Sequence, residues 1–235
     1  MKKIIQHLKE DWYKYLLEIL VIALSIFAGL ELENWNENRK EKKLTVIYLE
    51  GLLFDLKSDT TYYSARIAES YRVIDGNKKF VVEIFQDQTF EEQRELFSQR
   101  EWANENITIQ NTTYTQLESS GGLSLFNNPN FTRKLVEYHK QSEIAYEHFQ
   151  EYNDAAGIAT DLFNNTITGR RFLLDSIYRY DDWRYINDPH HDWFKITLNE
   201  AIFHIEKHEV FIGYYEDLRN RAVELLNLIQ KDLGS

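Results

Sequence analysis

Two histidines near the end of the chain have a spacing that can hold a metal ion. His204 and His208 are four residues apart, so a helix would place both imidazole rings on one face. Glu200 precedes them by one more turn. The segment reads HIEKH, however, with Ile205 where the H-E-x-x-H motif of metalloproteases needs its glutamate. We therefore predict no bound metal, and interpret His208, which falls near an apolar stripe, as a hydrogen-bonded core histidine.

Other reactive constellations are weaker in this sequence. Asp188, His190, His191 and Asp192 form a second group of potential metal ligands, but a polar loop explains them equally simply. The chain has no cysteine, which excludes thiolate metal sites, thiol nucleophiles and disulfides. It also lacks the glycine-rich phosphate and dinucleotide motifs and the G-x-S-x-G nucleophile elbow. We expect neither a catalytic residue nor a cofactor.

An aromatic, polar segment at 176–193 is the best candidate for a recognition surface. Because it contains Pro189 and no helical pattern, we expect an ordered loop. Rigid aromatic rings beside arginine suit a protein interface or a sugar, although the same side chains could simply pack over the end of a helical bundle. The candidate recognition residues are Tyr178, Tyr180, Trp183, Arg184, Tyr185 and Trp193.

The segment from Trp12 to Trp35 is expected to cross a membrane. Its uncharged run, Ile19 to Leu30, is short, but the 24 residues between the two tryptophans correspond to roughly 36 Å of helix, close to the thickness of a bilayer. A buried helix of a soluble domain and a cleaved signal peptide are the alternatives. Aromatic side chains at both ends resemble the belts found at lipid–water boundaries; the belt residues are Trp12, Tyr13, Tyr15 and Trp35.

One face of this helix is suited to contact with another helix. Glu18, Ser25 and Gly29 are separated by seven and four residues and therefore share a side. The pair Ser25 and Gly29 is a small-xxx-small arrangement, which permits close approach of helices in lipid, and a carboxyl group in the span is expected to face protein or water. We infer that this face meets a second copy of the chain; alternatively, Glu18 extends to the headgroups.

Length and charge limit the remaining possibilities. The chain has 235 residues and a net charge of −11, without a concentrated basic face, so nucleic acid is not an expected partner. We divide it into an amphipathic lead-in at 1–11, the transmembrane anchor at 12–35 and a helical domain at 36–235. Four lysines precede the uncharged run and four basic residues follow it, so the positive-inside rule does not orient the chain.

Hydrophobic periodicity beyond the anchor predicts an all-α bundle of three long helices with short helices between them. The first long helix is expected to continue the anchor as one rod, with a break near Gly76; the second begins at Pro129 and the third near Phe194. Thr89 and Glu92 fit a capping box that starts a short helix. The expected core stripes are Leu49, Leu53, Leu56, Thr60, Tyr63, Ile67, Tyr71 and Ile74; Phe131, Leu135, Tyr138, Ser142, Ala145, Phe149, Tyr152, Ala156, Ala159 and Phe163; and Leu198, Ile202, Ile205, Ile212, Tyr215, Leu218, Ala222, Leu226 and Ile229.

Two motifs resemble a known family. ENWNENRKEKK, from Glu33 to Lys43, directly follows the span, and NTTYTQLESSGGLSLF extends from Asn111 to Phe126. Both are similar to segments of the uncharacterised single-span helical membrane proteins of Bacteroidota. That resemblance implies an inner-membrane protein with its C-terminal domain in the periplasm, and no catalytic residue. The second motif is interpreted as a structural corner, with a ligand pocket as the alternative.

The resulting functional hypothesis is a non-enzymatic, membrane-anchored scaffold or accessory subunit that self-associates or joins an inner-membrane complex. Its expected partners are the lipid bilayer and either a second copy or another membrane protein. A ligand-sensing domain that signals through a partner, an oligomeric pore lined by Glu18 and a metal-dependent hydrolase are the alternatives.

Overall fold

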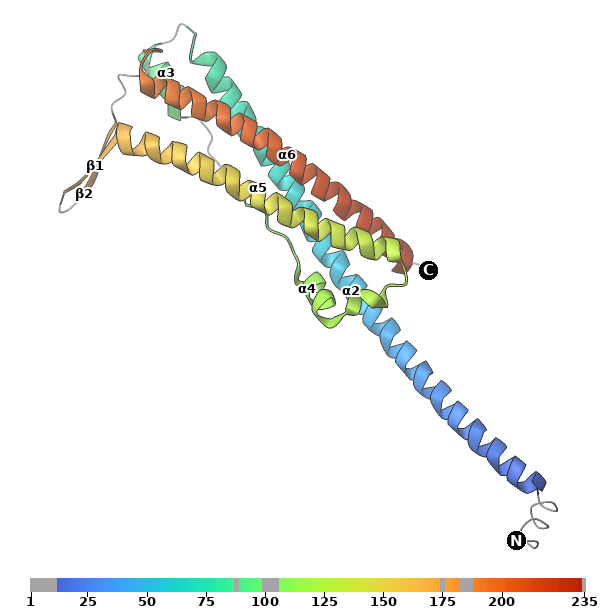
Figure 1. Ribbon diagram of the computed structural model, residues 1–235. Coiled ribbons are helices and arrows are strands. Elements are labelled where there is room, and N and C mark those ends of the chain that lie inside the picture. The colour runs from blue at the N-terminus through green and yellow to red at the C-terminus, as the bar shows by residue number, and fades with distance from the viewer. Residues whose placement is uncertain (1–11, 87–88, 99–105, 174–175, 182–187, 234–235) are drawn as a thin grey trace.

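Three long helices lie side by side and form an all-α bundle, as predicted (Figure 1). The computed structural model describes residues 12–86, 89–98, 106–173, 176–181 and 188–233. The long helices are α2 (Trp12–Glu83), α5 (Pro129–Ile167) and α6 (Asp192–Leu233). Helix α2 extends far beyond the other two, and α6 returns toward the point where α2 leaves the bundle.

Helix α2 is one continuous rod of 72 residues, about 110 Å long at 1.5 Å per residue. It passes through Trp35 without interruption, so the anchor and the first bundle helix are a single element, as the sequence predicted. The expected break at Gly76 is wrong: the helix continues to Glu83. A lone glycine weakens a helix by only about 1 kcal/mol, which packing on both sides of Gly76 outweighs.

Short elements close the two ends of the bundle. At the end far from the anchor, α3 (Phe90–Ser98) begins with the predicted capping box: the Thr89 N–H donates to Glu92 Oε2 at 2.7 Å, and the Glu92 N–H donates to Thr89 Oγ1 at 3.3 Å. Nearer the anchor, α4 (Thr112–Ser120) is followed by the 3₁₀ turn η1 (Gly122–Leu125). Gly121 ends α4 with a left-handed φ of 70°, a conformation that glycine adopts without steric cost.

The loop expected at 176–193 is a strand at its start and a helix at its end. Strand β1 (Thr168–Leu173) pairs antiparallel with β2 (Ser176–Asp181), directly after α5 ends. Helix α6 begins at Asp192, so Trp193 belongs to a helix and not to a loop. The loop prediction is therefore wrong for these parts, because the alternating residues of 176–181 have a strand-compatible period that the aromatic content obscured.

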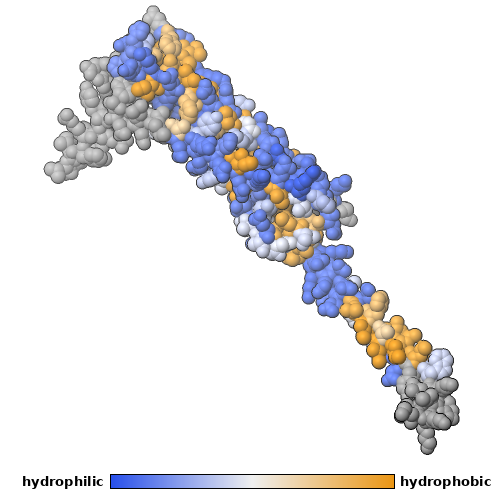
Figure 2. Space-filling model, viewed as in Figure 1, coloured by the Kyte–Doolittle hydropathy of each residue, from blue (hydrophilic) through white to orange (hydrophobic). Residues whose placement is uncertain are grey.

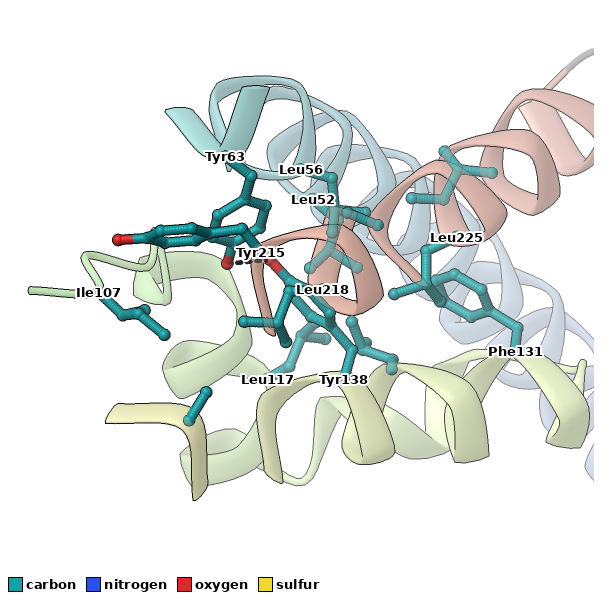
Figure 3. Packing of buried hydrophobic residues seen from close by; sticks show 14 of the residues in the cluster. Leu52, Leu56, Tyr63, Ile107, Leu117, Phe131, Tyr138, Tyr215, Leu218 and Leu225 are labelled. Atoms are coloured by element: carbon teal, nitrogen blue, oxygen red, sulfur yellow. Dashed lines mark hydrogen bonds between the residues drawn. The ribbon is translucent and has the colours of Figure 1, made fainter. Parts of the chain in front are cut away.

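Among the residues that the structure describes, two apolar clusters form, which we call the main core and the distal core. The main core joins α2, α4, α5 and α6, and Figure 3 shows Leu56, Tyr63 and Tyr138 converging with residues of α6. The distal core lies at the end far from the anchor and consists of Phe80, Ile84, Leu96, Phe194 and Ala201. Burial of these side chains, at about 1.5–3 kcal/mol each, is the main stabilising contribution.

The predicted core stripes are confirmed for most of the bundle. On α5, every predicted position from Phe131 to Ala156 is buried or half-buried; the side chains of Ala159 and Phe163 lie outside the described part. On α2, Tyr71 is wrongly assigned to the core, since it is 51% exposed and Ser70 takes the buried position. On the first half of α6, Ile202 is wrongly assigned to the core, since it is 37% exposed, whereas Leu198 and Ile205 are half-buried; Glu200 and His204 are buried there although the stripe left them out.

Candidate functional site

The apolar segment of α2 is exposed on every side. Eleven large apolar side chains from Leu16 to Leu32 each expose at least half of their surface, and the apolar window of this helix has no part buried in the chain. Figure 2 shows this segment as an apolar zone near the end of the rod, followed by a hydrophilic zone before the bundle. The helix is long and apolar enough to cross a membrane, with a mean hydropathy of 2.1 over that window.

The aromatic belt residues flank this segment as the sequence placed them. Trp12, Tyr13 and Trp35 are 60%, 55% and 62% exposed, so each ring is open to the surroundings of the rod. The Tyr15 side chain lies outside the described part of the structure. Arg39 places its guanidinium 5.8 Å from the centre of the Trp35 ring, a cation–π contact one turn beyond the belt. This end of the segment therefore combines an amphipathic ring with positive charge, the composition of a headgroup boundary.

Glu18, Ser25 and Gly29 lie on one exposed side of the rod. No atom of another element is within 4 Å of a Cβ built on Gly29, so this side of the helix is open to a close neighbour. The Ser25 hydroxyl donates to the Val21 carbonyl at 2.7 Å and thus needs no partner from outside its own helix. The chain therefore presents the predicted contact face without covering it.

The predicted recognition residues are only partly described. Tyr178 and Tyr180 lie in β2 and Trp193 in the first turn of α6, but their side chains are outside the described part; Trp183, Arg184 and Tyr185 lie outside it altogether. The neighbouring acidic–histidine group is an exposed turn, in which the His190 N–H donates to Asp188 Oδ1 at 2.9 Å before α6 begins.

His204 and His208 lie within a buried polar layer between the main core and the distal core. The two residues are 3% and 0% exposed, and their ring centroids are 6.3 Å apart. His208 Nδ1 is 3.1 Å from the Ser70 hydroxyl of α2. The prediction of a hydrogen-bonded core histidine is confirmed for His208. Among the described residues, no group of three or more histidine, aspartate or glutamate side chains is arranged to hold a metal ion.

The polar layer also includes a buried ammonium group. Lys207 has no exposed surface, and its Nζ donates to Asn153 Oδ1 of α5 at 3.3 Å while lying 5.6 Å from the Phe211 ring centre. Polar groups withdrawn from water require such specific partners, so this layer fixes how the three long helices pair. The layer comprises the half-buried Asn153 and the buried Ser70, Asn77, Thr197, Glu200, His204, Lys207 and His208.

The sequence contained a signal for this layer that the apolar pattern hid. Tyr215 and Leu218 are buried on α6, and steps of three or four residues backward from them reach Phe211, His208 and His204. The prediction instead followed the apolar residues Leu198 and Ile202, of which Leu198 is half-buried against the distal core and Ile202 is exposed. Following the helical period backward from Tyr215, and not the hydrophobicity of each residue, would have located the polar layer.

A second buried polar site connects α2 to the segment that contains the Asn111 motif. Asp55 Oδ2 accepts the Thr113 N–H at 3.2 Å, so a carboxylate of α2 satisfies an amide in the first turn of α4, where Asn111 makes no side-chain cap. Asp59 Oδ1 accepts the Gln110 N–H at 3.0 Å. These contacts support the interpretation of the motif as a structural corner.

Asp59 is also bonded within the main core. The Tyr138 hydroxyl donates to Asp59 Oδ2 at 2.7 Å, and the Tyr63 and Tyr138 oxygens are 3.1 Å apart. Burial raises the pKa of Asp59 to about 6, because desolvation and the nearby Asp55 outweigh the stabilising N–H of Gln110 and the hydroxyl of Tyr138. Burial likewise raises the pKa of both tyrosines, so they act as neutral hydrogen-bonding groups.

No family model, curated protein or solved structure matches the chain. The resemblance of the two sequence motifs to single-span helical proteins therefore stays a prediction.

Proposed function

We propose that this chain is a membrane-anchored, non-catalytic scaffold or accessory subunit that self-associates or joins a larger complex in the bacterial inner membrane. The observation that supports it most is the complete exposure of the apolar segment of α2. Transferring eleven large apolar side chains out of water, at roughly 1.5 kcal/mol or more each, exceeds the net stability of a typical domain. A lipid bilayer is the solvent that suits such a segment.

Continuity of α2 supports a mechanical role. The rod enters the bundle without a loop, so the orientation of the anchor in the bilayer fixes the direction and the rotation of the bundle. A subunit of this kind holds its extramembrane domain at a defined height and angle above the membrane. We place the bundle in the periplasm, a location that the motif resemblance implies and that the absence of cysteine suits.

Self-association is proposed through the side of the anchor that carries Glu18, Ser25 and Gly29. The full-length chain, solubilised in a mild detergent, should have the mass of an oligomer or of a complex with a co-purifying partner. Gly29→Ile should reduce this association by blocking close approach, whereas Ala23→Ile, on the opposite side of the helix, should not. A strictly monomeric particle without partners would contradict the proposal.

A ligand-sensing domain is the second candidate, and the buried polar layer is the observation that favours it. Small-molecule sites in bundles are commonly built from polar side chains on facing helices, as Ser70, Asn153 and His208 are here. The rigid α2 would carry a change in this layer toward the membrane. A thermal-shift screen of the full-length chain with dicarboxylates, sugars and Zn²⁺ tests this candidate; no stabilising compound, or equal stabilisation of a Ser70→Ala variant, would count against it.

A further inference from the structure

The side of α2 that faces away from the bundle carries an uncharged row outside the anchor. Phe54, Thr61, Ala65 and Ala68 are separated by seven, four and three residues, so they form one line along the helix, which we call the outer row. All four are exposed, and Phe54 is 72% exposed, more than Trp12 or Trp35 in the belt. Ile47, seven residues before Phe54 and 61% exposed, lies on the same side, with the exposed Glu50 between the two.

The outer row is opposite the core. Leu56 and Tyr63 follow Phe54 and Thr61 by two residues, which is about 200° of rotation around the helix, and both are buried in the main core. No long helix of the bundle therefore covers the outer row. Gly51 faces Thr113 of α4 on an adjacent side, with the Thr113 Oγ1 2.9 Å from a built Cβ.

The outer row repeats the pattern of the anchor face. Glu18, Ser25 and Gly29 are followed 36 residues later by Phe54, Thr61 and Ala65. At 3.6 residues per turn this offset is about ten turns, so the two rows lie on the same side of one uninterrupted helix. A straight neighbour that lies parallel to α2 and contacts the anchor face therefore also meets the outer row.

The chemistry of the outer row suits burial between helices. The Thr61 hydroxyl donates to the Lys57 carbonyl at 2.9 Å, and its methyl group is left to pack, just as the Ser25 hydroxyl donates within its own helix. The Thr61 hydroxyl would therefore keep its hydrogen bond if the row were covered. Exposed charged side chains flank the row on the same side of α2: Glu50, Lys57 and Arg72.

We propose that the outer row docks against the outer row of a second copy of this chain, so that an interface begun in the bilayer continues along the bundle. This inference rests on the proposed membrane-anchored, self-associating function. A shared bilayer holds two copies parallel and at the same depth, and an isologous contact then brings each residue opposite its own copy. Only a partner that lies parallel to α2 can cover both rows at once, and a second copy anchored in the same bilayer lies parallel to it.

Cysteine cross-linking tests the proposal directly, because the chain has no cysteine of its own. Single variants Thr61→Cys and Ala65→Cys, in full-length chain within native membranes, should form disulfide-linked dimers on mild oxidation. The matched control is Ala155→Cys, an exposed alanine on α5, which should cross-link at least tenfold less. Adding Ala65→Glu to Thr61→Cys should reduce the dimer at least tenfold, whereas adding Ala155→Glu should leave it unchanged.

A further variant, Ser25→Cys, separates this inference from the proposed function. Cross-linking at Ser25 without cross-linking at Thr61 or Ala65 would overturn the outer-row interface while leaving self-association in the membrane intact. Absence of cross-linking at all three positions would overturn both. Equal cross-linking at Ala155 would indicate random collision, and would also overturn the outer-row interface.

Discussion

At the scale of single residues, ionisable groups that the bundle buries decide how its stability depends on pH. Asp59 and His139 are both in or beside the main core, and burial moves their pKa values in opposite senses, to about 6 and about 4. His139 is stacked on Tyr114 of α4, with ring centroids 3.8 Å apart. Both groups therefore report on how the segment from Asn111 to Phe126, which we call the corner segment, contacts the long helices.

Asp59→Asn should make the bundle more stable relative to wild type as the pH rises from 4 to 6. The folded carboxyl binds its proton more tightly than the unfolded one, so ionisation costs folding free energy that grows from the unfolded pKa of 3.8 up to the folded pKa of about 6. The difference between variant and wild type should change by on the order of 2–3 kcal/mol across this window and stay constant above it. Thermal unfolding of the detergent-solubilised chain measures this.

His139→Gln provides the opposite control. A histidine with a lowered pKa loses stability as the pH falls from the unfolded value of 6.5 through about 4, because the unfolded chain binds the additional proton. Its removal should therefore help most at low pH. Two variants with the same pH dependence would show that the corner segment does not bury these groups.

Gly121→Ala should destabilise the chain by about 1 kcal/mol. Its φ of 70° is strained for alanine, although the space around a Cβ is open, so the cost is conformational and not steric. Gly213→Ala is the matched control, since that glycine also has open space but lies within α6, where alanine is the better helix former by roughly 0.5–1 kcal/mol. Shifts of the same sign in urea-induced unfolding would contradict the left-handed cap.

At the scale of elements, the sequence predicted helices better than it predicted their faces. Pro129 located the start of α5, and Thr89 with Glu92 located the start of α3, because caps and breakers are local signals. The hairpin of β1 and β2 was missed because the aromatic content of 176–181 obscured the alternation of a strand. The polar layer of α6 was missed for a similar reason: burial of His204 follows from helix phase and neighbours, not from residue type.

The rigidity of α2 has a consequence that insertions can measure. Two alanines inserted between Glu41 and Lys42, in the exposed zone after the belt, should rotate the bundle by about 200° relative to the anchor. Cross-linking of Ser25→Cys should persist, whereas that of Ala65→Cys should be lost. Seven inserted alanines, about 20° short of two full turns, should restore it. Loss of cross-linking with both insertions would indicate that helix phase is not what couples the two rows.

At the scale of the whole molecule, a rod with an apolar end and a three-helix bundle define a geometry more clearly than a reaction. The bundle has its own cores, and the exposed segment of α2 contributes nothing to them. The part of α2 that stabilises the bundle is thus separate from the part that is long and apolar enough to cross a membrane.

Membrane attachment of the untagged, full-length chain is the most direct test of the central claim that lipid surrounds the segment of α2 from Leu16 to Leu32. After an alkaline carbonate wash and flotation through a density gradient, the chain should stay with the lipid fraction and be released only by detergent. A variant carrying Ile22→Arg and Phe27→Arg should be released by the wash. Recovery of the unmodified chain in the aqueous fraction without detergent would contradict the claim.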